Sequence, residues 1–404
     1  MRILLIAFRN FTRNSRRFLL LGLAVTAGFL FVCTAQSLVA GLSFQINMRG
    51  ARYYGGHVII SQTQALARHI TPAEENLLIV GAIGRAGIHA AEISHRTRFD
   101  TDGVVFFNGE SVMTRRIIGE DWSEEGPRIK GLEFVSGNPD EMTDPRGGLI
   151  SEVTARRLGA RVGDQIVLRV TRQGGAIDTI PLLVKAIFRE VSIFGFYTVY
   201  MDRGVLNQAL GFEPGYSATV GLYLDDYRGA DWVAMRLNAA LDKHYTARPV
   251  VSFMEEVRTM LQALSAVSNG VLALLAIVVA VGILNLYRVI IYERTREIGT
   301  MRAIGLQQTQ VRNIILLEAL FLALCSACAG LALSAIVLRA LSLLNFVGAA
   351  GFDIFLDRGH LAWVLYADNV GIDVLLITAV TIVGALGPAR AAKSIEPVKA
   401  LRAE

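Results

Sequence analysis

The chain has 404 residues, of which 53% are hydrophobic and 19% charged, and its mean hydropathy is +0.44. This composition is too apolar for an ordinary soluble protein and too charged for a chain that lies entirely within a membrane. It predicts a few membrane spans together with a sizeable soluble domain. The net charge of +5 becomes informative only when the basic residues are assigned to loops.

Four apolar runs are long enough to cross about 30 Å of hydrocarbon, which takes roughly 20 residues of helix. They are residues 18–40, 259–287, 313–338 and 370–387. The first two runs carry no charge, the third carries only Glu318 and the fourth only Asp373. Because both acids lie toward the ends of their runs, we expect them to reach the headgroup region rather than to form an ion site.

The distribution of basic residues predicts the orientation. They precede the first run (Arg2, Arg9, Arg13, Arg16, Arg17), lie between the second and third (Arg288, Arg294, Arg296, Arg302, Arg312) and follow the fourth (Arg390, Lys393, Lys399, Arg402). By the positive-inside rule, residues 1–17, 288–312 and 388–404 are cytoplasmic, and residues 41–258 and 339–369 are extracytoplasmic. The predicted fold class is an α-helical membrane protein with four transmembrane helices and a large α+β extracytoplasmic domain between helices 1 and 2.

Residues 41–258 contain both strand-like and helix-like segments. Strands are predicted at 56–62, 164–170 and 179–188, and the Gly-Gly pair at 174–175 suits the tip of a hairpin between the last two strands. Amphipathic helices are predicted at 72–83, 151–158 and 228–244. This mixture lacks a βαβ rhythm and indicates an α+β domain. The segment 252–264 enters the second span without a helix breaker, which predicts one long helix that continues out of the membrane as a stalk.

No catalytic or metal-binding motif stands out. None of the six histidines forms an HExxH motif, and G-x-S-x-G is absent from the sequence. Cys325 and Cys328 have CxxC spacing but lie inside the third apolar run, where packing of small residues is the expected role. The stretch 387–394, GPARAAKS, differs from a phosphate-binding loop by Ala392 and follows a membrane helix, so no ATPase site and no cofactor are assigned to the chain. No nucleic-acid partner is expected either.

The charged stretch YERTREIGTMRAIGLQQTQVRNI, residues 292–314, lies between two apolar runs. Ile298, Met301 and Ile304 recur at helical spacing, and Gly305 supplies a helix stop. A short amphipathic helix of this kind can lie on the membrane surface or in a groove of another protein. Charged residues of both signs, among them Glu293, Arg294, Arg296 and Glu297, favour the protein groove.

The same stretch resembles the E-x-x-R-E-I-G-x-x-x-A-[IM]-G motif of MacB-like ABC-transporter permeases. That superfamily includes the lipoprotein-releasing permeases LolC and LolE and the FtsX division proteins. The C-terminal PARAAKSIEPVKALRAE, residues 388–404, is similar to the closing motif of the family. Within the large domain, LISEVTARRLGARVGDQIVLRV, residues 149–170, is most like the lipoprotein-releasing branch.

The resemblance implies that residues 293–305 form the coupling helix, which rests in a groove of a separate ABC ATPase dimer. The contact residues it implies are Glu293, Arg296, Glu297, Ile298, Met301, Arg302 and Gly305. ATP and Mg would be bound by that ATPase and not by this chain. A second permease copy or a paralogue would complete the complex in the bacterial inner membrane. Nucleotide-driven motion would pass through the stalk to the outer domain (mechanotransmission), where a lipoprotein or amphiphilic substrate is extracted from the outer leaflet.

One departure from the lipoprotein-releasing pattern keeps alternatives open. In LolC-type subunits an extended loop between the two strands recruits a periplasmic carrier, whereas here only TRQGGAIDTIP, residues 171–181, connects them. The chain is therefore a LolE-like partner, or no carrier docks at this position. MacB-like efflux of hydrophobic molecules or peptides and FtsX-like signalling to a cell-wall hydrolase are the alternative functions. The sequence identifies no substrate-binding residue.

Overall fold

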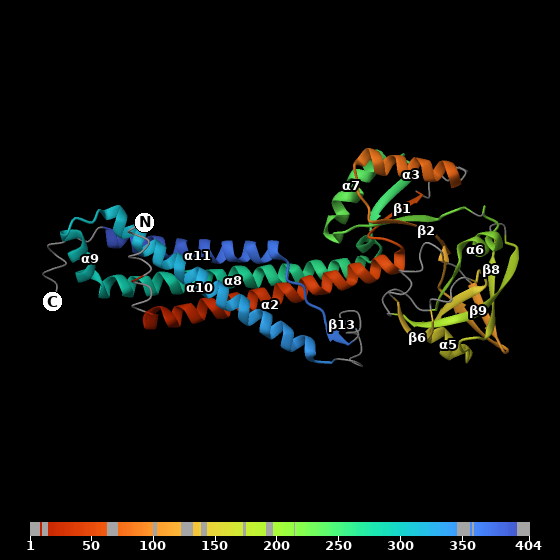
Figure 1. Cartoon of the computed structure of the whole chain (residues 1–404), viewed down its shortest axis with the longest axis horizontal. Helices are drawn as coiled ribbons and strands as arrows, with labels where there is room; N and C mark the ends of the chain where they lie inside the picture. The colour runs from red at the N-terminus through yellow and green to blue at the C-terminus, as the bar shows by residue number, and fades with distance from the viewer. Residues whose placement is uncertain are drawn as a thin grey trace. The chain divides into compact units, whose positions relative to one another are not determined.

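The computed structural model describes residues 9, 15–62, 72–99, 103–122, 132–138, 144–172, 175–190, 197–213, 215–345, 356–357 and 359–393. The chain divides into two compact units (Figure 1). A helical unit comprises residues 1–43, 259–348 and 356–404, and a sheet domain is built around residues 44–258. Arg2 and Arg13 of the predicted cytoplasmic N-terminus and the end of the closing motif, residues 394–404, lie outside the described residues.

The described part of the helical unit contains residues of these long and short helices: α2 (Ser15–Tyr54), α8 (Glu255–Glu293), α9 (Thr295–Ala303), α10 (Gln308–Leu343) and α11 (Ala367–Lys393). All but α9 are long and apolar enough to cross a membrane, which confirms the four predicted spans. Each helix is longer than its apolar run because the polar flanking residues continue the same helical turns. The stalk helix begins at Glu255 rather than at 252, because Val250–Phe253 forms a separate 3-10 turn.

Small residues bring the long helices into backbone contact. A Cβ atom on Gly330 of α10 would lie 2.9 Å from the Thr26 carbonyl oxygen of α2, and one on Gly384 of α11 would lie 2.9 Å from the Ala280 carbonyl oxygen of α8. Close approach at small residues is the usual way in which helices associate within a membrane. A glycine at both positions is therefore needed for the observed packing.

The prediction for the two acids inside the spans was wrong. Glu318 is 1% exposed and Asp373 is 4% exposed, so neither carboxylate reaches the solvent around the chain. Because α10 already begins at Gln308, Glu318 lies well inside the helix, where helical phase turns it toward α8 and α9. Asp373 is hydrogen-bonded to Gln36 of α2.

The expected role of Cys325 and Cys328 also differs, because both side chains are exposed and do not pack inside the chain. The described residues contain no group of three or more His, Cys, Asp or Glu side chains that could hold a metal ion. Residues 387–393 of the phosphate-loop-like stretch are helical, so they do not form the loop that such a motif requires.

Among the described residues of the sheet domain, twelve strands form one sheet in the order β12-β1-β11-β2-β5-β10-β7-β9-β8-β3-β4, with β6 paired to β9. The strands are β1 (Val58–Gln62), β2 (Glu92–Phe99), β3 (Gly103–Phe107), β4 (Glu110–Thr114), β5 (Arg116–Glu120), β6 (Glu133–Gly137), β7 (Gly147–Ser151), β8 (Gln165–Thr171), β9 (Ile177–Arg189), β10 (Thr198–Asp202), β11 (Thr219–Tyr223) and β12 (Tyr245–Pro249). Helices α3 (Pro72–Ala86), α5 (Glu152–Leu158), α6 (Arg203–Leu210) and α7 (Ala230–Ala240) accompany them. The predicted α+β class is confirmed.

Buried hydrophobic clusters stabilise both halves of this sheet. Near β1, the apolar residues Val58 and Ile60 pack with Ile79 of α3 and Leu237 of α7. Another cluster lies beneath β8, whose side chains alternate strictly between buried and exposed, and includes residues of α5 and α6. Strand β2 joins the halves because it pairs with β11 through residues 92–96 and with β5 through residues 97–99.

The predicted hairpin is present. Strands β8 and β9 pair antiparallel as far as Thr171 opposite Ile177, and the Arg172 N–H donates to the Ala176 carbonyl oxygen at 2.7 Å. Of the Gly-Gly tip, residue 174 lies outside the described residues and Gly175 has φ +86°. The connection between these strands is therefore as short as the sequence indicates.

The C-terminal end of α2 is fixed to the sheet domain by buried side chains. The Arg96 guanidinium donates to the Arg52 and Tyr53 carbonyl oxygens at 2.7 and 3.1 Å, and it forms an ion pair with Glu120 at 2.8 Å. The Tyr223 hydroxyl donates to the Ala51 carbonyl oxygen at 3.1 Å. The last carbonyls of a helix have no partner within it, and a cation there complements the helix dipole. This end of α2 is thus held by strands β2 and β11.

Candidate coupling site

The candidate site is built by the turn from α8 into α9 and from α9 into α10. Helix α8 ends at Glu293, and Arg294 takes a non-helical conformation (φ −97°, ψ 10°) before α9 begins at Thr295. The Thr295 hydroxyl donates to the carbonyl oxygens of Ile291 and Tyr292 at 3.0 and 2.9 Å. Side-chain bonds of this kind satisfy carbonyls that the interrupted helix leaves open. The chain therefore bends at Arg294 without losing its local hydrogen bonds.

Helix α9 ends in a Schellman motif centred on Gly305. The Leu306 N–H donates to the Met301 carbonyl oxygen at 3.1 Å, and the Gly305 N–H donates to the Arg302 carbonyl oxygen at 3.0 Å. Gly305 has φ +105°, a conformation that only glycine adopts readily. Next, α10 begins with a capping box in which Gln307 and Gln310 exchange side-chain bonds with each other's backbone. The predicted helix stop at Gly305 is confirmed.

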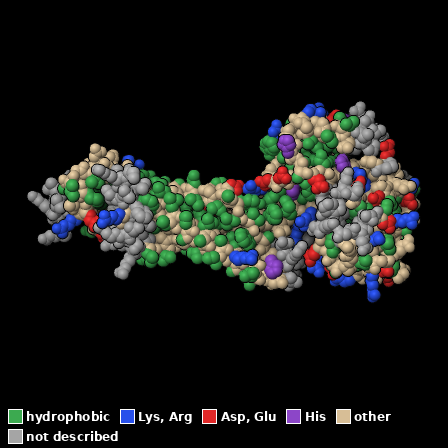
Figure 2. All heavy atoms as spheres, in the orientation of Figure 1, with side chains coloured by type: hydrophobic (Ala, Val, Ile, Leu, Met, Phe, Trp, Pro, Cys, Tyr) green, Lys and Arg blue, Asp and Glu red, His purple; other side chains and the backbone are tan. Residues whose placement is uncertain are grey.

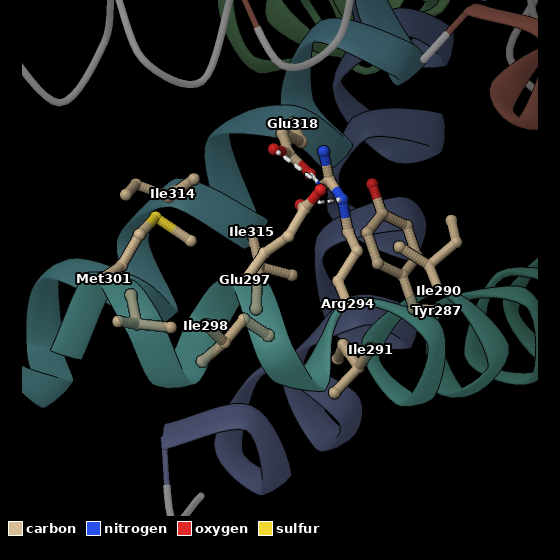
Figure 3. Close-up of a pocket in the computed structure, with 11 residues that line it drawn as sticks. Tyr287, Ile290, Ile291, Arg294, Glu297, Ile298, Met301, Ile314, Ile315 and Glu318 are labelled. Carbon is tan, nitrogen blue, oxygen red and sulfur yellow. Dashed lines mark hydrogen bonds and ion pairs between the residues drawn. The ribbon is translucent and has the colours of Figure 1, made fainter. Parts of the chain in front are cut away.

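A pocket lies between α8, α9 and α10 (Figure 3). It encloses about 410 Å³ of space, including its open mouth. Apolar side chains form most of its wall, and the lining residues are Tyr287, Ile290, Ile291, Arg294, Glu297, Ile298, Met301, Val311, Ile314, Ile315 and Glu318. Three of these residues are charged, and Figure 3 shows them converging on one side of the pocket.

Arg294 is the centre of the charged group. Its Nη1 atom lies 3.1 Å from Oε2 of Glu318 and its Nε atom lies 3.3 Å from Oε2 of Glu297. The side chains of Arg294 and Glu318 are 11% and 1% exposed, whereas that of Glu297 is 53% exposed. One guanidinium therefore joins a buried carboxylate of α10 to a largely exposed carboxylate of α9.

The predicted contact residues fall into two groups. Glu293, Arg296, Glu297 and Gly305 are exposed, and Arg302 is half-buried. By contrast, Ile298 is 4% exposed and belongs to the hydrophobic core of the helical unit, against which Met301 also packs. Ile298 and Met301 thus hold α9 against its own chain. Contact of the exposed residues with an ATPase stays a prediction.

Ile304 does not share the buried face of Ile298, although its helical spacing predicts that it would. Helix α9 ends at Ala303, so Ile304 occupies the cap position and its side chain is 79% exposed. Tyr292 is 85% exposed at the other end of the turn. We call the set Tyr292, Glu293, Arg296, Glu297, Thr300 and Ile304 the exposed coupling face, since all six side chains are exposed.

On the face shown in Figure 2, hydrophobic side chains cover the middle of the long helices, and charged side chains reappear near α9. Neither the exposure of the apolar side chains of Tyr292 and Ile304 nor the Arg294–Glu318 ion pair was predicted from the sequence. The exposed position of Ile304 follows from where α9 ends. The signal in the sequence that points to the ion pair is a lone acid in one apolar run, close to a loop that carries several arginines.

Comparison with known proteins finds similarity to ABC-transporter permeases. Residues 269–397 match the FtsX-like permease C-terminal domain. The ABC transporter permease YtrF of Bacillus subtilis is 23% identical over 304 residues, which cover 72% of this chain and 66% of that protein. The lipoprotein-releasing system transmembrane protein LolC of Haemophilus influenzae is 22% identical over 318 residues, which cover 76% of each. This chain thus spans about two thirds of YtrF and three quarters of LolC.

A macrolide export ATP-binding/permease protein MacB of Burkholderia pseudomallei is 29% identical over 150 residues, which cover 37% of this chain and 21% of that protein. Among solved structures, the periplasmic region of MacB from Actinobacillus actinomycetemcomitans aligns with 52% of this chain and 95% of its own. The TM-score of that alignment is 0.34 and the sequence identity is 13%.

Proposed function

We propose that this chain, which is an ABC transporter permease of the FtsX, MacB and LolC type, receives ATP-driven motion from a separate ATPase dimer through the exposed coupling face. The observation that carries the proposal is the division of α9 into two sides. Ile298 and Met301 fix one side of α9 to the helical core, whereas Arg296 and Glu297 on α9 are exposed, as are the two apolar side chains that flank the helix, Tyr292 and Ile304.

The exposed coupling face has the composition of a protein contact. Tyr292 and Ile304 are exposed by 85% and 79%, and Glu293, Arg296 and Glu297 lie between them in sequence. Large apolar anchors surrounded by polar groups supply most of the affinity in protein interfaces. A helix that lies on a membrane surface usually carries a more uniformly basic polar face. The mixture of both signs therefore favours a protein partner over lipid.

In this proposal both termini and α9 are cytoplasmic, and the sheet domain lies outside the inner membrane of a bacterium. A second copy of the chain, or a paralogue, pairs with it, and ATP with Mg is bound only by the ATPase. The substrate class that we propose is a lipoprotein or another amphiphile extracted from the outer leaflet. The LolC relative supports this class because the similarity extends over 76% of both chains.

The short β8–β9 hairpin bears on whether a periplasmic carrier docks on this chain to receive the substrate. Because the two strands pair up to Thr171 and Ile177, the connection has no room for the extended carrier-recruiting loop of LolC-type subunits. We propose that the chain is the LolE-like subunit of a pair, or that no carrier docks at the β8–β9 connection. A gene for an outer-membrane duct beside this one would instead favour efflux, and a cell-wall hydrolase gene would favour signalling.

Two variants test the ATPase contact. Ile304→Glu places a charge at an apolar anchor, and Glu297→Lys reverses a charge, a change that can cost several kcal/mol at an interface. Neither change alters the hydrophobicity of a span. We expect both variants to insert at normal levels and to lose the co-purified ATPase, measured as the molar ratio of the two subunits after affinity purification.

Glu110→Lys is the matched control, because Glu110 is exposed on β4 in the sheet domain and the same charge reversal there should leave the subunit ratio unchanged. Glu297→Lys also removes the Arg294–Glu297 contact, in which the Arg294 side chain is only 11% exposed, so Ile304→Glu, which leaves that contact intact, is the decisive variant of the two. Retention of a full ATPase complement by both site variants would place the contact elsewhere.

A further inference from the structure

The Arg294–Glu318 pair links the bend before α9 to the third long helix. Arg294 lies at the one non-helical position between α8 and α9, and Glu318 lies on α10, which follows α9 in sequence. The Arg294 Nη1 atom is 3.2 and 3.1 Å from the two Glu318 carboxylate oxygens. A single guanidinium group thus spans the pocket wall between two helices (Figure 3).

The surroundings make this pair difficult to separate. Glu318 is 1% exposed, and the pocket around it is lined by Ile290, Ile291, Ile314 and Ile315. A buried carboxylate that loses its cation is left without the charge that compensates it, and most of the pocket wall is apolar. Glu318 also lies in a helix long and apolar enough to cross a membrane, where an uncompensated charge is costly.

Arg294 makes one contact that is exposed and one that is buried. Arg294 meets Glu297 through Nε at 3.3 Å, within the exposed coupling face, and meets Glu318 through Nη1 in the interior. The apolar residues Ile298 and Met301 hold the rest of α9 against the same core. The bend and α10 are therefore joined by both packing and charge.

We propose that Arg294 and Glu318 are positioning residues that lock α9 to α10, so that α9 and the first part of α10 move as one body. This inference rests on the proposed function. In this arrangement a displacement imposed on α9 enters the membrane through α10 as well as through α8. Helices transmit displacement because they are stiff, and packed contacts with discrete arrangements resist gradual deformation.

The first test measures the lock in the chain alone, in lipid nanodiscs and without any ATPase. Spin labels are placed at Ala303→Cys, which is exposed at the end of α9, and at the natural Cys325, which is exposed on α10. Cys33 and Cys328 are replaced by Ala. Pulsed electron resonance should give a narrow distance distribution for the otherwise unchanged chain and a broad or shifted one for Glu318→Gln and for Arg294→Met.

Two further variants control this test. Arg312→Gln removes a cation at the same end of α10, one that donates to the neighbouring Asn313 amide oxygen, and it should leave the distribution narrow. The exchanged pair Arg294→Glu/Glu318→Arg should restore the narrow distribution. If a single variant fails to accumulate, the neutral double variant Arg294→Met/Glu318→Gln replaces it. A narrow distribution in Glu318→Gln, or a broad one in a well-folded exchanged pair, would overturn the lock.

The second test uses the complex with its ATPase and distinguishes a lock from simple structural support. Cys325 labels on the two permease copies should shift in distance when ATP is trapped. In Glu318→Gln this shift should be lost while the ATPase stays bound and continues to hydrolyse ATP. An undiminished shift would refute the inference. Failure of the unchanged chain to bind an ATPase would instead refute the proposed function and leave the first test to decide the lock.

Discussion

Burial determines the protonation state of His57, which lies between the end of α2 and strand β1. His57 is 3% exposed, and its Nδ1 atom accepts a hydrogen bond from the Leu224 N–H at 3.0 Å. A ring nitrogen that accepts must carry no proton, so the folded state holds the imidazole in its neutral form. Burial lowers the pKa of His57 below its ordinary value of 6.5, because the charged imidazolium is poorly solvated there.

This shift predicts how the stability of the sheet domain depends on pH. Because the folded pKa is lowered, the unfolded chain binds the proton more tightly, so the contribution of neutral His57 is present above pH 6.5 and is lost as the pH falls through the folded pKa. His57→Gln retains an acceptor but does not titrate. The unfolding temperature of the unchanged chain should therefore fall more steeply than that of His57→Gln between neutral and mildly acidic pH. Parallel slopes for the two proteins would contradict the prediction.

Sequence patterns could not reveal which residues are buried as pairs. Arg294 and Glu318 were recognised only as a loop arginine and a lone acid in an apolar run, and the carboxylate was expected at the headgroups. Their contact depends on where α9 and α10 begin, and a shift of one residue rotates a side chain by about 100° around a helix. Ile304 was misassigned for the same reason, since its exposure depends on α9 ending one residue earlier.

At the level of elements, the segments with strong local patterns were predicted and the others were not. Strand β8 alternates apolar and polar residues throughout, and α5 has a serine cap at Ser151 and a glycine stop at Gly159. By contrast, short strands such as β5 and β10 are defined by pairing with each other across a long sequence separation. Five-residue runs of this kind carry little local signal, because tertiary contacts decide their structure.

A buried arginine contributes to the attachment of α2 to the sheet. Arg96 and Glu120 have side chains that are 4% and 0% exposed, and their ion pair is 2.8 Å long. Arg96→Met would leave the Glu120 carboxylate buried without its cation and remove the bonds to the Arg52 and Tyr53 carbonyl oxygens. We expect a loss of about 3–5 kcal/mol in the free energy of unfolding of the sheet domain, measured by denaturant unfolding of the full chain in detergent.

The control for Arg96→Met is Arg156→Met, which breaks an i,i+4 pair with Glu152 at 3.0 Å where the arginine side chain is 72% exposed. Pairs of that kind contribute about 0.3–0.5 kcal/mol. Similar losses for the two variants would show that burial of the Arg96–Glu120 pair does not govern its contribution.

For the whole molecule, the proposed transmission of motion requires a stiff connection across the membrane. Helix α8 is continuous from Glu255 to Glu293, which confirms the predicted long helix. The sequence could predict this continuity because no proline or cluster of glycines interrupts the run. It could not predict how α9 is held, because that depends on side-chain packing between helices.

Inserting Gly-Gly-Ser-Gly after Leu264 would place a hinge within α8. Each glycine costs roughly 1 kcal/mol of helix stability relative to alanine, so the insertion should interrupt the helix. We expect release of a labelled lipoprotein from proteoliposomes to be lost while ATP hydrolysis by the complex persists, because the coupling face near Glu293 is unchanged. The same insertion in the β3–β4 turn at Asn108 and Gly109 should preserve both activities. Unchanged release after the α8 insertion would show that motion does not pass through this helix.

The central claim is that the exposed side of α9 contacts an ABC ATPase, and site-specific photo-crosslinking in growing cells tests it most directly. A photoreactive phenylalanine analogue at Ile304, which is 79% exposed, should capture a protein that carries a phosphate-binding loop and is identified by mass spectrometry. The same analogue at Ile298, which is 4% exposed, should capture no ATPase, because that side chain packs inside the helical unit. Capture of lipid alone from position 304, in a chain that inserts normally, would contradict the account.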